Sequence, residues 1–125
     1  MVVRNELSDE QIDRVFQALA ASTRRDILRR TIAEEQSVSD LARDYDMSFA
    51  AVQKHVAVLE AAELIVKRAE GRERLVRANP EMIARARALL ARYEDLWRSR
   101  ISRLDDLLAE DDLGTGPAPR GSTTP

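Results

Sequence analysis

The spacing of the apolar residues changes once along this chain, after Leu64, and that change restricts the fold more than any other feature. Up to Leu64 the apolar residues recur at intervals of three and four, which is typical of amphipathic helices. Residues 65–68 and 74–77 instead alternate with a period of two, and Glu70-Gly71-Arg72 between them has the composition of a turn. The pattern predicts a β-hairpin that follows several helices.

Four helices are predicted before the hairpin. Ser8 to Gln11 forms a capping box for the first helix, and Ser22 and Ser48 are candidate caps of the second and fourth helices. The third helix is expected to be short, from Val38 to Tyr45, with Asp46-Met47 as a tight link to the fourth. Two short helices joined by a tight turn and followed by a basic hairpin predict a winged helix-turn-helix fold, mainly α with a small β-hairpin.

A long last helix is predicted after the hairpin. Asn79 is its expected cap, Pro80 fits its first position, and the helical spacing runs to about Leu108. Roughly 26 residues would span about 39 Å at 1.5 Å per residue, which is more than a small domain can cover. The apolar stripe could be buried in the monomer's own core, but its excess length favours packing on a partner subunit. The residues expected in such a dimer interface are Leu90, Tyr93, Trp97, Ile101 and Leu104.

The composition limits the protein's class and location. A length of 125 residues is typical of one domain, and we expect it to span 1–112, with a disordered tail over 113–125 that is rich in Gly, Pro, Ser and Thr. The chain has no cysteine, which excludes disulfides and thiolate metal sites. It has no long apolar stretch and no secretory signal at its start, so a soluble cytoplasmic protein without membrane contacts is expected.

The distribution of charge indicates where nucleic acid could bind. The net charge is −2, yet residues 67–78 carry five basic residues against two acidic ones. Arg68, Arg72 and Arg74 lie near the predicted hairpin tip, where a wing would meet the DNA backbone or minor groove. The alternative for these arginines is a solvated edge strand protected by charge.

The fourth predicted helix has the composition of a DNA-reading helix. Val52 and Val56 would anchor it, which leaves Ser48, Phe49, Ala50, Gln53 and Lys54 on its outer side. Such a helix meets base edges through residues near its N-terminus.

Each outer residue has a plausible partner on the duplex. Gln53 can pair with adenine, Lys54 with guanine or phosphate, and the helix start at Ser48 with phosphate, while Phe49 and Ala50 could meet a thymine methyl group. The alternative is an ordinary surface helix. His55, the single histidine, is expected to pack structurally or to touch a phosphate.

Four separate blocks of this sequence resemble the ArsR/SmtB family of winged-helix repressors. They are residues 18–28 (ALAASTRRDIL), 38–42 (VSDLA), 48–64 and 70–72 (EGR), and the similarity covers about residues 10–108. The resemblance implies a homodimeric DNA-binding repressor. Tyr93 to Trp97, followed by Ile101 and Leu104, resembles a metal-independent branch of the family.

Three positions depart from the family pattern. Glu63 stands where the family usually has glycine, at a position that often needs a left-handed backbone, so either the turn differs or some strain is tolerated. Phe49 and Ala50 replace commoner polar residues, so an operator sequence cannot be transferred from relatives.

Metal sensing and catalysis are not expected. Metal-sensing relatives place cysteines on the third helix or His and carboxylates on the last helix, whereas here Asp95, Asp105, Asp106 and Glu110 offer only oxygen ligands. One histidine without a nucleophile or partner acid is no catalytic site, so we expect no enzyme and no cofactor.

The sequence therefore predicts a homodimeric, sequence-specific repressor that binds double-stranded DNA at a pseudo-palindromic operator. A small-molecule or protein effector is left open. The alternative is a winged-helix module that binds another protein.

Overall fold

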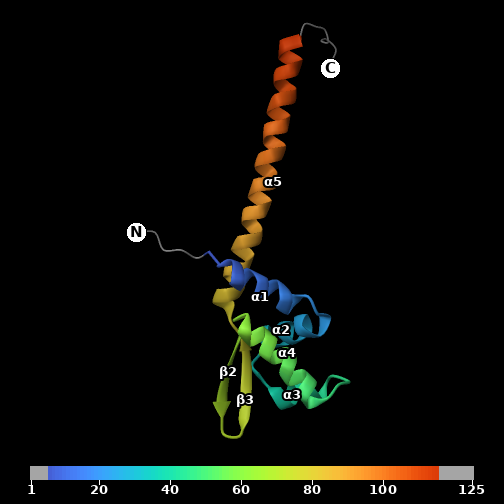
Figure 1. The fold of residues 1–125 in the computed structure, drawn as a ribbon, viewed down its shortest axis with the longest axis vertical. Coiled ribbons are helices and arrows are strands. Elements are labelled where there is room, and N and C mark those ends of the chain that lie inside the picture. The colour runs from blue at the N-terminus through green and yellow to red at the C-terminus, as the bar shows by residue number, and fades with distance from the viewer. Residues whose placement is uncertain (1–5, 116–125) are drawn as a thin grey trace, which may run out of the picture. The chain divides into compact units, whose positions relative to one another are not determined.

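The computed structural model describes residues 6–115, and their side chains as far as Asp111. Its elements, in chain order, are α1 (Asp9–Leu19), α2 (Ser22–Ala33), β1 (Gln36–Ser37), α3 (Val38–Arg43), α4 (Phe49–Ala61), β2 (Ile65–Glu70), β3 (Glu73–Ala78) and α5 (Pro80–Thr115) (Figure 1). This order confirms the predicted winged helix-turn-helix fold, with a three-stranded wing sheet and a long C-terminal helix. The described residues form two compact units, residues 6–89 and residues 90–115.

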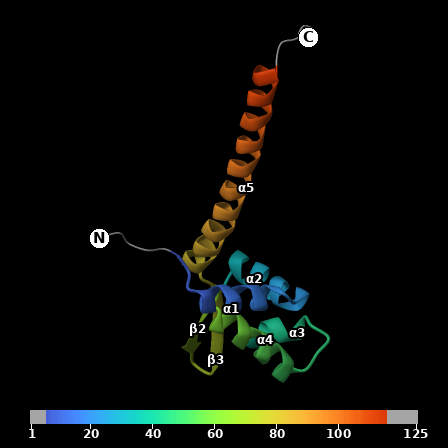
Figure 2. The same cartoon turned by 45° about the horizontal axis from the view of Figure 1, so that its top comes forward.

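The first unit has one hydrophobic core, to which every helix from α1 to α4 contributes. Figure 2 shows these helices gathered beside the strands. Val52, Val56 and Leu59 of α4 are buried, as the helical spacing predicted, and they share the core with Ile27 of α2 and Leu41 of α3. Each large aliphatic side chain removed from water contributes roughly 1.5–3 kcal/mol, which holds α4 against the other helices. The outer side of α4 is therefore fixed in place.

The wing sheet contains one strand that the sequence analysis missed. The antiparallel order is β1-β3-β2, with Gln36 opposite Val76 and Ser37 opposite Leu75. β1 has only two residues, too few to show a period, so nothing local could reveal it. The predicted hairpin is confirmed: Glu70 pairs with Glu73, and Gly71 has a φ of 63°, which glycine adopts without strain.

The helix starts were predicted correctly at two serines and wrongly at a third. Ser8 forms the capping box with Gln11, and the Ser48 hydroxyl accepts a hydrogen bond from the Ala51 N–H at 3.1 Å. Ser22 does not cap α2; it is the first helical residue, and Ala21 is the N-cap without a side-chain bond.

Two arginine side chains stabilise the turn between α1 and α2. Arg24 donates to the carbonyl oxygens of Ala18 and Gln17, and Arg25 donates to that of Leu19. These bonds satisfy the free carbonyls at the end of α1 and determine how the chain enters α2 without a serine cap.

α3 ends earlier than the predicted Tyr45, at Arg43. The N–H of Asp44 bonds back to the Leu41 carbonyl, which closes the helix, and the Tyr45 hydroxyl instead donates to Asp26 of α2. The link to α4 is correspondingly longer than the two residues expected.

Glu63 adopts the left-handed conformation that the family pattern assigns to glycine, with φ 63°. The Glu63 N–H bonds to the Glu60 carbonyl at 2.8 Å and the Leu64 N–H to the Leu59 carbonyl at 3.1 Å. These two bonds form a Schellman motif, and Leu59 and Leu64 are both buried beside it. The sequence left two alternatives, a different turn or tolerated strain. The structure keeps the turn, and the strain at Glu63 is tolerated.

α5 extends beyond the predicted end near Leu108, to Thr115. The side chain of its predicted cap, Asn79, donates to the Glu63 carbonyl at 2.9 Å, so this residue joins the start of α5 to the end of α4. The predicted tail begins at 113, where the helix still continues, and residues 116–125 lie outside the described part of the chain. Within residues 6–115, no helix has the length and apolar character needed to cross a membrane.

Candidate nucleic-acid interface

The start of α4 exposes the residues that the sequence assigned to DNA. Ser48, Phe49, Ala50, Gln53 and Lys54 are all exposed, and the Phe49 side chain is 47% exposed although it is aromatic. Val52 and Val56 on the opposite side are buried. The helix therefore presents a mixed polar and apolar surface at its N-terminal end, supported by a rigid core.

His55 is part of the supporting structure. It is half-buried, and the Arg24 guanidinium donates to its Nδ1 at 3.1 Å. Burial, and secondarily the charge of Arg24, lowers the pKa of His55 below its ordinary value. Nδ1 is therefore unprotonated and Nε2 carries the ring hydrogen. The bond links the start of α2 to α4, a contact that the sequence analysis did not identify.

The three predicted wing arginines fall into two groups. Arg68 makes a bidentate bond to Glu35, with both N···O distances 3.0 Å, and an ion pair with Glu70 at 2.8 Å. Arg72 and Arg74 at the hairpin tip are exposed and have no ion-pair partner among the residues described. The charges of Arg72 and Arg74 are thus available to a ligand, whereas that of Arg68 is already balanced.

A polar cluster behind α3 positions the helix-turn-helix. Arg30 donates to Gln36 at 2.8 Å and to Asp44 at 2.7 Å, and its guanidinium lies 5.5 Å from the centre of the Tyr45 ring. Hydrogen bonds, first from Tyr45 and then from Arg29, hold the pKa of Asp26 below its ordinary value. The cluster ties α2 to the link between α3 and α4. The sequence analysis missed it, because its members lie far apart in the chain.

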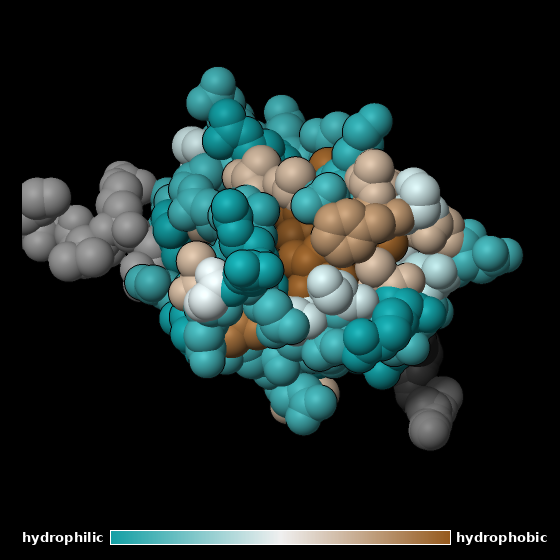
Figure 3. Space-filling view, turned by 90° about the horizontal axis from the view of Figure 1, so that it is seen from below, coloured by the Kyte–Doolittle hydropathy of each residue, from teal (hydrophilic) through white to brown (hydrophobic). Residues whose placement is uncertain are grey.

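The face seen from below in Figure 3 combines apolar and hydrophilic side chains. Apolar side chains occupy its middle, and hydrophilic side chains surround them.

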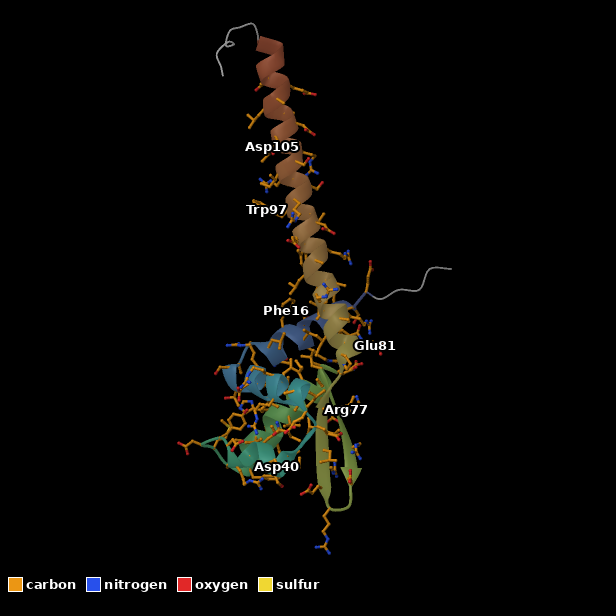
Figure 4. All side chains as sticks on the ribbon, turned by 180° about the vertical axis from the view of Figure 1, so that it is seen from behind. Phe16, Asp40, Arg77, Glu81, Trp97 and Asp105 are labelled. Atoms are coloured by element: carbon orange, nitrogen blue, oxygen red, sulfur yellow. The ribbon has the colours of Figure 1, made fainter. Side chains whose placement is uncertain are left out.

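The second unit exposes the stripe that the sequence assigned to a dimer interface. Leu90, Tyr93, Trp97, Ile101 and Leu104 are between 38% and 58% exposed. Figure 4 shows Trp97 on the surface of α5. Among the described residues of the chain, no cluster of three His, Cys, Asp or Glu side chains could hold a metal ion.

Comparisons with known proteins agree with this architecture. The family model of a helix-turn-helix domain matches residues 19–68. A curated relative, the HTH-type transcriptional regulator Rv2034 of Mycobacterium tuberculosis, is 40% identical over 81 residues, which are 65% of this chain and 76% of the relative.

Solved structures extend the similarity. The ArsR family transcriptional regulator RHA00566 is 35% identical, with a TM-score of 0.70 over 75% of this chain and 97% of its own. The homodimeric winged helix-turn-helix DNA-binding domain Mb0332 of Mycobacterium bovis, a possible ArsR-family regulator, is 24% identical, with a TM-score of 0.55 over 72% of this chain and 91% of its own.

The fold, the exposed start of α4 and the wing together define a winged helix-turn-helix DNA-binding protein. The identities and coverages above place it more narrowly: the chain belongs to the ArsR family of transcriptional regulators. It is therefore a transcriptional regulator and not an enzyme.

Proposed function

We propose that this regulator is a repressor that binds a pseudo-palindromic operator as a homodimer. The observation that carries the proposal is the combination of an exposed α4 start with unpaired arginines at the tip of the adjacent wing. Occupying an operator requires no catalytic group, and a bacterial regulator of this kind acts in the cytoplasm.

The contacts at each half-site follow from the exposed side chains. Gln53 reads an adenine edge and Lys54 a guanine edge or a phosphate, because both leave the outer side of α4 near its N-terminus. The N–H groups at Ser48 bind a phosphate. Arg72 and Arg74 bind the backbone or minor groove and supply affinity for every sequence.

Arg68 and His55 have different roles in this proposal. Arg68 holds the wing to the segment before β1 through Glu35, and His55 holds α4 to Arg24. Both residues position the interface, and any phosphate contact they make adds to that function.

The exposed stripe on α5 supports the homodimer. A soluble monomer rarely leaves so continuous a row of large apolar side chains in water. Leu90 and Ile101, Tyr93 and Leu104, and Trp97 and Leu108 are each eleven residues apart, and an eleven-residue repeat keeps one face of a helix aligned along its length. The homodimeric state of the Mycobacterium bovis domain favours the same assembly here.

A binding selection tests the proposal. Random duplexes are enriched on the purified protein, and the selected sequence is footprinted and its affinity measured at several salt concentrations. We expect two inverted half-sites about 10 bp apart and an affinity that falls steeply with salt. A single asymmetric half-site would contradict the dimer, and the absence of any salt-sensitive duplex binding would favour the protein-binding module.

We also infer that operator release is independent of metal ions. Soft metals are sensed through thiolates or histidine clusters, and this chain has no cysteine and one histidine, which is bound to Arg24. Micromolar zinc, cadmium, nickel and arsenite should leave operator affinity unchanged. Release of the duplex by any of these ions would refute the inference.

A further inference from the structure

A surface pocket of about 620 Å³ lies within the first unit, and no residue of α4 lines it. The end of α2 and the residues after it form one wall, β3 forms the second, and the first turns of α5 form the third. This volume is within the range of small-molecule sites in proteins. The proposed function gives the pocket no role.

The pocket has an apolar interior. Ile32 of α2 is 58% exposed there, and Ile83 of α5 packs partly against the core beneath it. The polar group at its base is satisfied internally, because the buried Thr31 hydroxyl donates to the Leu28 carbonyl at 2.9 Å. An apolar ligand would therefore cover side chains that now face water and would displace no internal hydrogen bond.

The charged side chains of the lining are two arginines and two glutamates, and neither arginine has an ion pair or hydrogen bond with another described residue. Arg77 and Arg87 face Glu34 and Glu35, but the Glu35 carboxylate is already held by the bidentate bond from Arg68. The donor groups of both guanidiniums are thus open to a ligand, while the four formal charges of the lining cancel. Arg77 comes from the wing strand β3, as Figure 4 shows, and Arg87 from α5.

We propose that this pocket binds a small apolar monocarboxylate. The ring or alkyl chain lies against Ile32 and Ile83, and the carboxylate binds Arg77 and Arg87, whose planar guanidinium groups match a carboxylate in two-point contacts. The occupant is an anion because a neutral ligand would leave the guanidinium donors of Arg77 and Arg87 unused, and it carries one charge because a second would meet the carboxylate of Glu34. The proposal for this ligand site does not depend on the proposed operator binding.

Calorimetry on the full-length protein without DNA tests the proposal. The probes are 2-naphthoate and octanoate, and each is compared with its neutral amide, which has the same apolar body. We expect at least one carboxylate to bind about tenfold more tightly than its amide, which corresponds to one charge-assisted hydrogen bond.

Variants locate the site. Arg87→Gln should weaken carboxylate binding by about tenfold, whereas Arg100→Gln, which removes an exposed arginine from the second unit of the same helix, should not. Ala84→Trp places a large side chain at the pocket wall and should abolish binding, with helix content and mass unchanged.

Four results would overturn the proposal. Neither carboxylate binds at millimolar concentration, or the amides bind as well as the acids. Arg100→Gln weakens binding as much as Arg87→Gln. Finally, Ala84→Trp turns a dimer into a monomer, which would show that a second copy of the chain occupies this surface.

Discussion

Replacing Glu63 by glycine should stabilise this protein, and the structure gives the size of the effect. Glu63 has a φ of 63° in the Schellman motif that ends α4. For a residue with a Cβ atom, this left-handed conformation costs about 1–2 kcal/mol. The motif uses only the N–H groups of Glu63 and Leu64, and Asn79 binds the Glu63 carbonyl, so glycine keeps all of these bonds.

Two further contributions determine the net change. Glycine loses about 0.5–1 kcal/mol through the greater freedom of its unfolded backbone. Removing a carboxylate from the C-terminal end of α4 gains about 0.3 kcal/mol, since the helix dipole disfavours negative charge there. We therefore expect Glu63→Gly to raise the free energy of unfolding by about 1 kcal/mol.

Urea unfolding at a fixed protein concentration measures this change, because the stability of a dimer depends on concentration. The midpoint should rise while the slope stays constant. Glu63→Ala, which removes the charge and keeps the Cβ atom, should change the midpoint little. Ala57→Gly, in the right-handed part of α4, should cost about 1 kcal/mol. A fall in the midpoint of Glu63→Gly, similar to that of Ala57→Gly, would refute the reasoning.

Three other predictions concern the interface, the assembly and pH. Gln53→Ala should cost about 1–3 kcal/mol of operator binding and little of the binding to unrelated duplexes, whereas Arg72→Ala should weaken binding to all duplexes alike and reduce the slope of log affinity against log salt by about 1. Competition gel shifts distinguish the two effects, and the reverse pattern would exchange the assigned roles. Ile101→Asp should give a folded monomer in sedimentation and circular dichroism, because an unpaired carboxylate in an apolar interface costs several kcal/mol. A variant that is still dimeric at micromolar concentration would place the interface elsewhere, for example on α1 at the exposed Phe16. The lowered pKa of His55 favours its neutral form in the folded state, so the stability that His55 contributes is complete above the ordinary pKa of about 6.5 and is lost as the pH falls below it. His55→Gln should therefore reduce the change in urea midpoint between about pH 7 and pH 5, and a pH profile equal to that of the unmodified protein would contradict this.

The features predicted correctly from the sequence are those with local signals. The Ser8 and Ser48 caps depend on a residue three positions away, and the hairpin depends on a two-residue period around Gly71. The buried side of α4 followed from spacing alone, because Val52 and Val56 are one helical turn apart.

The features that were missed depend on contacts between distant residues. Arg68 and Glu35 are 33 residues apart, and Arg24 and His55 are 31 apart, so no local window contains either pair. The Glu35 pair shows that the charge of Arg68 is already balanced, and the Arg24 pair gives His55 a partner consistent with the structural packing expected from the sequence. Ser22 was predicted as a cap from its residue type, but the arginines that satisfy the end of α1 made a side-chain cap unnecessary.

Glu35 provides a physical connection between the proposed ligand pocket and the wing. It lines the pocket and also binds Arg68 of β2. The hydrogen bond from Arg68 is the main cause that lowers the pKa of Glu35, and the charge of Arg77 on the neighbouring strand adds to it. A carboxylate bound to Arg77 would compete with Glu35 for that arginine, so the ligand would alter the electrostatic balance that holds the wing. Ligand binding would then change operator affinity only if the wing has two states that bind the ligand with different affinities. Because such coupling is reciprocal, the factor by which the ligand changes operator affinity must equal the factor by which the operator changes ligand affinity.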